Sequence, residues 1–298
     1  MDAPLDAERH ARPTTARSRE LGWELHLARK RANLTATAVA EELGWSLGKL
    51  SKLENGWRGA DPWDYGTLLG RLGADRRTRD RVRRIASEQD VGLFARPLED
   101  RVPDRLTCVT IHERAALTMQ GYDPMVVPGL LQTEAYARAV VATSGALSDA
   151  ELDAVVRIRV ERQAVLTGER SPETTCYIHE TALRSVVGGD RVMHDQMMRL
   201  VFMCGWKRLH PRVVPLAAGG HWALGHSYNL MTFGRGLAPV VYTENDVSAV
   251  FAEEEGAVER FRHKSACLDE LALDVERSRR VFSQWATVYG RRAQRGAD

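Results

Sequence analysis

Side chains that can donate hydrogen bonds to phosphates or to the edges of DNA bases gather between residues 35 and 58 of this 298-residue chain. Lysine and arginine donate to guanine O6 and N7 or to phosphate oxygens, and hydroxyl and amide groups also reach phosphates. Two residues with apolar or absent side chains stand among them and would permit close approach to a base. The candidate contacts are Thr35, Thr37, Ser46, Leu47, Gly48, Lys49, Ser51, Lys52, Asn55 and Arg58. These residues would contact DNA if the elements that carry them present them to a groove.

Two short helical runs on either side of Gly44 would position these side chains. Gly44 tolerates the positive φ that turns the chain between helices. Thr35 and Ser46 stand where N-caps are needed, just before each run. One apolar face continues along both runs and consists of Val39, Ala40, Leu43, Leu50 and Leu53. The pattern predicts a helix-turn-helix, whose second helix presents its first residues to the major groove. An ordinary pair of antiparallel helices in a bundle is the alternative.

Each residue at the start of the second helix could make a different kind of contact with DNA. Ser46 would cap the helix and offer its backbone amide to a phosphate. Leu47 can make only an apolar contact, for which a thymine methyl group is the natural target. Gly48 permits close approach, and Lys52 can donate to guanine or to a phosphate. Thr37 would contact a phosphate from the first helix.

Each polar candidate also has a purely structural interpretation. Thr35 and Asn55 could serve only as helix caps. Lys49, Lys52 and Arg58 could form a solvated surface without a partner. The sequence leaves these alternatives open.

Residues 21–72 resemble the five-helix DNA-binding domain of Xre-type regulators, the lambda-repressor-like group. The resemblance is carried by "LARKRANLT" and "VAEELGWSLGKLSKLENG", which match helix 1, the helix-turn-helix and the glycine that follows it. It implies an ion pair between Arg29 and Glu54. Related domains often have glutamine-like residues where this chain has Leu47 and Gly48. We therefore expect few direct base contacts, with groove shape supplying part of the specificity.

Composition changes along the chain predict two domains. Residues 1–17 are polar and contain two prolines, which is typical of a disordered tail. A mixed-charge helix is expected from Asp75, and two prolines with little periodicity follow it. The predicted order is a tail at 1–17, a helix-turn-helix domain at 18–90, a linker at 91–105, a regulatory and dimerisation domain at 106–290 and a second tail at 291–298.

The second domain mixes helical and strand patterns. Helices are predicted at 149–167, 190–206, 256–272 and 275–289, with Asp274 as the cap between the last two. A strand is expected at 176–178. Three further β-rich runs, at 212–216, 227–233 and 239–243, predict a small antiparallel sheet. The expected fold is mainly α, with an N-terminal five-helix domain followed by an α+β domain.

Aromatic residues lie on or beside this predicted sheet. Small-molecule sites commonly combine aromatic walls with a few polar groups. The candidate ligand-binding residues are Trp206, His221, Trp222, Tyr228 and Tyr242. Ordinary core packing, or a surface for a protein partner, would explain the same residues.

No catalytic or metal-binding pattern stands out. The nine histidines form no H-E-x-x-H or zinc spacing, and the four cysteines are scattered. Phosphate-binding and nucleophile-elbow motifs are absent from the sequence. Glu180 and Glu244 each end a predicted strand, but ordinary hydrogen-bonded or solvated carboxylates explain them better than a catalytic pair. We expect a protein that is not an enzyme and that needs no cofactor or metal.

Composition and charge are those of a globular protein, with 44% hydrophobic and 28% charged residues and a net charge of +2. Residues 1–90 hold 17 basic and 14 acidic residues, so the small positive excess lies with the predicted DNA-binding end. Neither an apolar leader nor a membrane span is apparent, which predicts a cytoplasmic protein. Only five of the 42 basic residues are lysine, which suggests a high-GC bacterial genome.

The second half resembles the C-terminal domain that commonly follows Xre-type domains in actinobacterial regulators, often grouped as antitoxin-like. The matching phrases are "PMVVPGLLQTEAYARA", "RQAVL", "HETALRSVVG", "VVPL" and "PVVYTEN". Together the two halves predict a transcriptional regulator of a double-stranded operator that acts as a homodimer, because one such domain reads only a half-site. Its second domain would receive a small-molecule or protein signal. Alternatively, the protein is antitoxin-like, binds a small partner protein and uses DNA binding for autoregulation.

Overall fold

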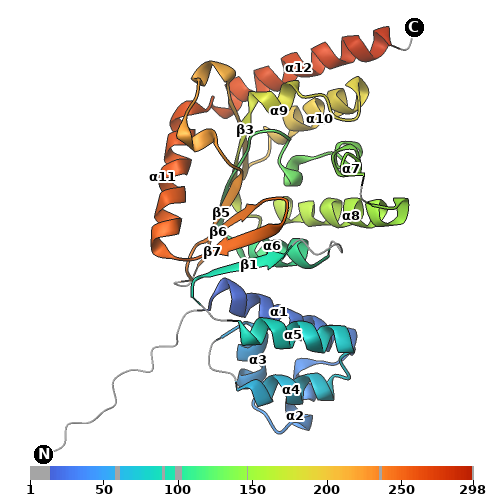
Figure 1. Cartoon of the computed structure of the whole chain (residues 1–298), viewed down its shortest axis with the longest axis vertical. Helices are drawn as coiled ribbons and strands as arrows, with labels where there is room; N and C mark the ends of the chain where they lie inside the picture. Colours follow the sequence, from blue (N-terminus) through green and yellow to red (C-terminus); the bar gives the residue numbers. More distant parts are fainter. Residues whose placement is uncertain are drawn as a thin grey trace, which may run out of the picture. The chain divides into compact units, whose positions relative to one another are not determined.

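The computed structural model describes residues 14–57, 61–88, 91–97, 103–145, 147–234 and 237–296. The chain divides into two compact units (Figure 1). The first comprises residues 1–94 with 234–238, and the second comprises residues 95–233 with 239–298. None of the described helices is both long enough and apolar enough to cross a membrane.

The described residues of the first unit form five helices, as the sequence predicts. They are α1 Ala16–Arg31, α2 Ala36–Glu42, α3 Leu47–Glu54, α4 Pro62–Arg71 and α5 Arg76–Ser87. Leucines that recur at helical spacing meet in one core, which includes Leu21, Leu25, Leu50, Leu53, Leu68 and Leu69. Because each helix contributes one apolar face, the opposite faces stay available for polar side chains.

Helix α1 begins two residues before residue 18, the predicted start of the helix-turn-helix domain. The reason is a capping box, in which Thr15 Oγ1 accepts from the Ser18 amide and Ser18 Oγ accepts from the Thr15 amide. The last residues of the predicted tail therefore belong to a capped helix. Residues 1–13 of that tail lie outside the described residues.

Two glycines let α1 pack directly on the end of α3. A Cβ on Gly22 would lie 2.5 Å from the Gly56 backbone nitrogen, and a Cβ on Gly56 would lie 2.2 Å from the Ser18 carbonyl oxygen. Gly56 also has a φ of +70°, in the region that favours glycine. The end of α3 is thus held against α1 by backbone contact, which a side chain at either glycine would prevent.

A seven-stranded mixed sheet with the strand order β1-β7-β6-β5-β2-β3-β4 forms the centre of the second unit. β2 pairs in parallel with β3, and β3 with β4, whereas β2, β5, β6 and β7 pair in antiparallel fashion. The strands are β1 Leu93–Pro97, β2 Thr118–Asp123, β3 Glu173–His179, β4 Leu209–Val214, β5 Tyr228–Thr232, β6 Val240–Glu244 and β7 Ser248–Ala252.

The expectation of a small antiparallel sheet is wrong in its size and in one of its strands, because the sheet has seven strands, but the runs at 227–233 and 239–243 do form the antiparallel pair β5 and β6. The run at 212–216 contributes to β4, which pairs in parallel with β3 rather than with the runs at 227–233 and 239–243. β2 escapes sequence analysis because Thr, Gln and Gly interrupt its apolar pattern, yet it occupies the centre of the sheet. Parallel pairing joins segments that are separated by whole helices, so local patterning does not reveal it.

Helices cover both faces of this sheet (Figure 1). One face packs on α11, where Val258 and Leu268 meet Tyr122 and Tyr228. α8 lies on the other side, and α10 packs lengthwise on α12 (Figure 1). The helices are α6 Pro103–Ala115, α7 Glu134–Ala142, α8 Asp149–Arg162, α9 Glu180–Arg184, α10 Asp190–Met203, α11 Glu255–Leu271 and α12 Val275–Arg295, with short 3₁₀ turns at Gly129–Leu131, Gln163–Leu166, Leu216–Ala218 and Trp222–Leu224.

Two predicted irregular segments contain regular structure. The predicted linker at 91–105 holds β1 and the start of α6. Helix α12 continues through the predicted tail at 291–298 as far as Arg295, so the prediction of a tail is wrong for residues 291–295. Asp274 caps α12 as predicted, because its Oδ1 accepts from the Arg277 amide at 2.7 Å.

Candidate functional site

The turn between α2 and α3 has the geometry that its sequence predicts. Gly44 adopts a φ of +64°, and the Trp45 amide donates to the Ala40 carbonyl at 2.8 Å, which closes the end of α2. Thr35 caps α2 by accepting from the Ala38 amide at 3.1 Å. Ser46 caps α3 by accepting from the Lys49 amide at the same distance. The helix-turn-helix is therefore held by local hydrogen bonds on both sides of the turn.

Helix α3 buries one face and exposes the other. Leu50 and Leu53 are buried in the core, whereas Leu47 at the first helical position is 52% exposed. Several predicted contacts are likewise exposed: Thr35, Thr37, Ser46, Gly48, Ser51, Lys52 and Asn55. Arg58 lies outside the described residues. The exposed face thus brings most of the predicted contacts together along α3 and the start of α2.

Lys49 has partners within the protein. Its Nζ lies 2.7 Å from Asp64 Oδ1 on α4 and 4.2 Å from the centre of the Trp45 ring. Lys52, one turn later, is exposed and forms no ion pair with a described residue. The two lysines therefore differ in how readily their charges can meet a phosphate.

Capping occupies part of the hydrogen-bonding capacity of two other candidates. The Thr35 hydroxyl accepts from the α2 backbone, as described above. Asn55 Nδ2 donates to the Ser51 carbonyl at 2.7 Å, at the end of α3. Both side chains fulfil the structural role that the sequence left open for them.

The ion pair that the resemblance implies between Arg29 and Glu54 is confirmed. Arg29 Nε and Nη2 donate to the two Glu54 oxygens at 2.6 and 2.7 Å, and His26 Nδ1 lies 2.9 Å from Glu54 Oε2. Burial works to raise the pKa of Glu54, but hydrogen bonds from Arg29 and His26 hold that pKa below its ordinary value. Arg29 Nη1 also donates to the Leu34 carbonyl at 2.9 Å. The pair ties the end of α3 to α1 and to the segment before α2.

The five aromatic candidates in the second unit do not form one site. Tyr228 and Tyr242 line a cavity, and Trp206, His221 and Trp222 do not. Trp222 is 52% exposed and stacks on His263 of α11, with ring centroids 5.5 Å apart. The His221–Trp222 segment packs beside α11, so it lies away from the cavity.

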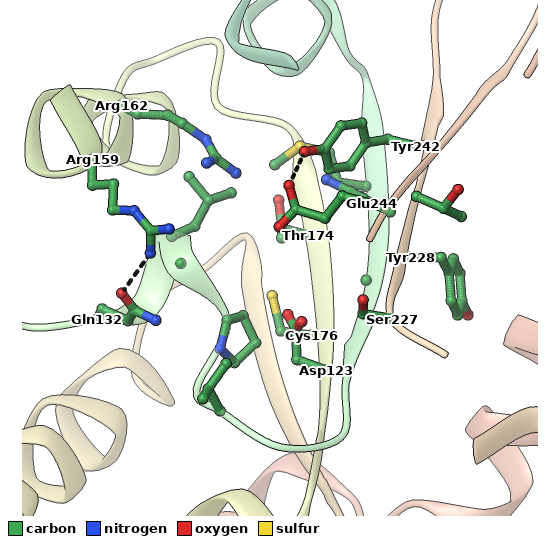
Figure 2. A pocket seen from close by; sticks show the side chains of 18 of the residues that line it. Asp123, Gln132, Arg159, Arg162, Thr174, Cys176, Ser227, Tyr228, Tyr242 and Glu244 are labelled. Carbon is green, nitrogen blue, oxygen red and sulfur yellow. Dashed lines mark hydrogen bonds between the residues drawn. The ribbon is translucent and has the colours of Figure 1, made fainter. Parts of the chain in front are cut away.

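This cavity has a volume of about 270 Å³ and lies over β2, β3, β5 and β6, beneath α8 and the segment at 126–132 (Figure 2). Its polar lining includes Asp123, Gln132, Arg159, Arg162, Asn229 and Glu244. Among these, only Glu244 is a candidate from the sequence, where a hydrogen-bonded or solvated carboxylate explains it better than a catalytic pair with Glu180. Asp123 had one available signal, its place at the end of a strand, but β2 itself was not recognised.

The cavity contains both signs of charge. Burial works to lower the pKa of Arg162, but Glu113 raises it above its ordinary value, with Nε–Oε2 and Nη2–Oε1 distances of 2.6 and 2.8 Å. Tyr242 donates its hydroxyl to Glu244 at 2.5 Å. Burial, with a smaller contribution from the Glu244 charge, raises the pKa of Asp123 to about 7. No cluster of three His, Cys, Asp or Glu side chains among the described residues is arranged to hold a metal ion.

Comparison with known families separates the same two parts of the chain. A family described as a helix-turn-helix domain matches residues 20–82. A family described as "Domain of unknown function (DUF5753)" matches residues 107–284, which is more than half of the chain. No curated protein and no solved structure matches the sequence.

Proposed function

Because the chain belongs to the DUF5753 family and carries a helix-turn-helix domain ahead of that family's domain, we propose that it is a cytoplasmic, sequence-specific transcriptional regulator without catalytic activity. The observation that carries this proposal is α3, a capped helix with a buried rear face and an exposed leading edge. The second unit then acts as the receiver of a signal.

The leading edge of α3 suits a DNA groove. The backbone amides at its start carry partial positive charge and favour a phosphate near Ser46. Gly48 has no side chain, so a base edge could approach the backbone there, and the exposed Leu47 offers an apolar contact. Lys52 supplies a cation that is not paired within the described part of the chain. Because base-reading groups are few, groove shape contributes to specificity.

Operator binding in this proposal requires two copies of the chain. One recognition helix covers a half-site, and dimeric regulators of this type read two half-sites separated by about 34 Å, or one turn of DNA. The proposed homodimer therefore binds a near-palindromic operator.

Selection of bound fragments from the host genome, followed by fluorescence anisotropy, tests this proposal. Lys52→Ala should weaken binding and reduce the slope of log K against log salt by about one unit. Lys207→Ala is the matched control, because Lys207 is an exposed lysine in the second unit. Equal affinities of wild type, Lys52→Ala and Lys207→Ala for the selected fragments would contradict the proposal.

The antitoxin-like alternative predicts a different primary partner. Phe202 on α10 is 70% exposed, which is the kind of apolar side chain that a protein partner covers. Affinity purification from the native host separates the two functions. A small protein recovered in equal amount without DNA, and lost on Phe202→Ser, would favour partner sequestration.

A further inference from the structure

We propose that the cavity of the second unit binds a small zwitterionic amine, about the size of a free amino acid with an uncharged side chain. Its ammonium group would donate to Asp123 and Asn229, and its carboxylate would face Arg159. The inference rests on the proposed function only in treating this molecule as the signal. The binding itself needs no DNA.

The sheet forms the floor of the cavity, at a point where β2 carries a glycine. Tyr242, Asn229, Gly121 and Cys176 lie opposite one another across β6, β5, β2 and β3. A Cβ on Gly121 would make ordinary van der Waals contacts, the nearest 3.5 Å from the Tyr228 carbonyl oxygen, and Gly121 lines the cavity without a side chain of its own. Asp123 lies two residues further along β2 and therefore on the same face. The glycine makes a hollow bordered by polar side chains.

Two hydrogen-bond acceptors at this floor are left without donors. Asn229 Oδ1 is buried and has no hydrogen-bond partner among the described residues. The Asp123 carboxylate forms no hydrogen bond or ion pair with any side chain in the described part of the chain. A buried acceptor such as Asn229 Oδ1 is almost always paired in folded proteins, and the half-buried Asp123 carboxylate lines the cavity beside it. An ammonium group, which has three donors and no acceptor, would satisfy both.

The side of the cavity formed by α8 carries cationic groups, in contrast to the hydrogen-bond acceptors on the sheet. Arg159 and Arg162 stand one turn apart on α8, and Figure 2 shows both guanidinium groups directed towards the open space. Arg162 is held by Glu113, so its charge is largely compensated. Arg159 Nη1 lies 3.5 Å from Gln132 Oε1, and Arg159 lines the cavity. A carboxylate on the ligand would meet this cation there.

The lining also argues against a metal ion and against a simple anion. A divalent cation at Asp123 would lack further ligands, because no cluster of three His, Cys, Asp or Glu side chains among the described residues is arranged to hold one. An anion without a donor would leave Asp123 and Asn229 unpaired. A zwitterion would place its ammonium group at the acceptors on the sheet and its carboxylate at the arginine side chains of α8.

Volume and lining limit the size of the ligand. The cavity of about 270 Å³ corresponds to roughly nine liquid-water volumes, which suits a ligand of the size of an amino acid. Val126, Leu130 and Val140 supply an apolar wall for an uncharged side chain. Glu244 is exposed and marks the open side of the cavity.

Thermal unfolding of the full-length protein without DNA tests the inference. The probes are the standard L-amino acids, each at about 10 mM, with the N-acetyl and methyl-ester derivatives of any that bind. A binding amino acid present at about 100 times its Kd should raise Tm by roughly 5 °C. Acetylation removes the ammonium charge and esterification removes the carboxylate, so each should abolish most of the shift.

Three variants locate the site by titration calorimetry. Asp123→Asn should weaken the affinity for that amino acid at least about tenfold, because a charge-assisted hydrogen bond is lost. Gly121→Val should fill the hollow and abolish binding while the protein still unfolds cooperatively. Asp195→Asn, at an exposed aspartate on α10, is the control and should bind like the wild type.

The inference is overturned if no amino acid shifts the Tm of the wild type. It is also overturned if Asp123→Asn and Gly121→Val bind as tightly as Asp195→Asn, or if the N-acetyl derivative binds as well as the free amino acid. Because these measurements contain no DNA, their failure would leave the operator-binding test unaffected.

Discussion

Lys49 on the recognition helix is paired with Asp64 on α4, at an Nζ–Oδ1 distance of 2.7 Å. The pair lies close to the face that we propose for DNA, with Lys49 stacked over the Trp45 ring. A phosphate that approaches Lys49 must therefore compete with a carboxylate of the same domain. This relationship makes Asp64 a determinant of DNA affinity.

Asp64→Asn should strengthen operator binding by roughly three- to tenfold, because it releases Lys49 and removes a negative charge near the phosphates. The salt dependence of binding should become steeper. Fluorescence anisotropy over a range of salt concentrations measures both quantities. Asp80→Asn changes the net charge equally at an exposed position on α5 and is the control. If the two variants bind alike, Lys49 does not contact DNA.

Gly56→Ala should unfold or strongly destabilise the first unit, by about 3 kcal/mol or more, because a Cβ would clash with the Ser18 carbonyl and the backbone has a positive φ. Gly66→Ala is the contrasting variant. Gly66 lies within α4, and a Cβ there would meet no atom within 4 Å. It should stabilise the unit by about 0.5–1 kcal/mol through helix propensity. Urea unfolding followed by circular dichroism measures both, and similar effects of the two substitutions would refute the packing argument.

Glu54→Gln should lower the free energy of unfolding of the first unit by about 2–4 kcal/mol, because Arg29 would lose its buried anionic partner. The pKa of Glu54 lies below its ordinary value, so its stabilising contribution is present above an unfolded-state pKa of about 4.3 and is lost as pH falls through the lower, folded-state pKa. Urea titrations between neutral and acidic pH measure this loss.

The matched variant Glu42→Gln removes the partner of Arg71 at a surface pair. It should cost about 1 kcal/mol or less. A Glu54→Gln protein whose stability depends on pH as steeply as that of the wild type would show that the loss originates elsewhere.

Asp123 should make the second unit less stable as pH rises. Its folded pKa of about 7 exceeds the ordinary value of about 4, so the folded state binds more protons between these values. The charges that face Asp123 are those of Glu244, Arg159 and Arg162. Stability should therefore fall by about 4 kcal/mol across this window in the wild type.

Asp123→Asn should flatten this pH dependence and raise Tm at pH values above that window, because it removes a buried group that would otherwise ionise. Scanning calorimetry across the window is the measurement, with Asp195→Asn as the control. A wild-type Tm that rises with pH while that of Asp123→Asn stays constant would reverse the sign and contradict the assignment. In the wild type, binding of the proposed amine should strengthen through the same window, because ionised Asp123 is its acceptor.

Sequence analysis predicted the helices of both units more completely than the sheet. Helix periodicity and caps such as Thr35, Ser46 and Asp274 are local, so they are visible in a short stretch of sequence. β2 was missed because Gly121 interrupts its apolar pattern, and that same glycine opens the floor of the cavity. The aromatic candidates were chosen by composition, which does not distinguish the two faces of a sheet. His221 and Trp222 consequently lie away from the cavity that Tyr242 lines.

The amino-acid sequence alone determined the helix-turn-helix, because its caps, its glycine turn and its apolar face all lie within about twenty consecutive residues. Only the tertiary structure decided that Lys49 is paired with Asp64 and that Asp123, Asn229 and Arg159 surround one cavity. These residues come from different helices and strands, and parallel pairing of β2 with β3 brings together segments separated by about fifty residues. Their proximity depends on long-range contacts that no local pattern records.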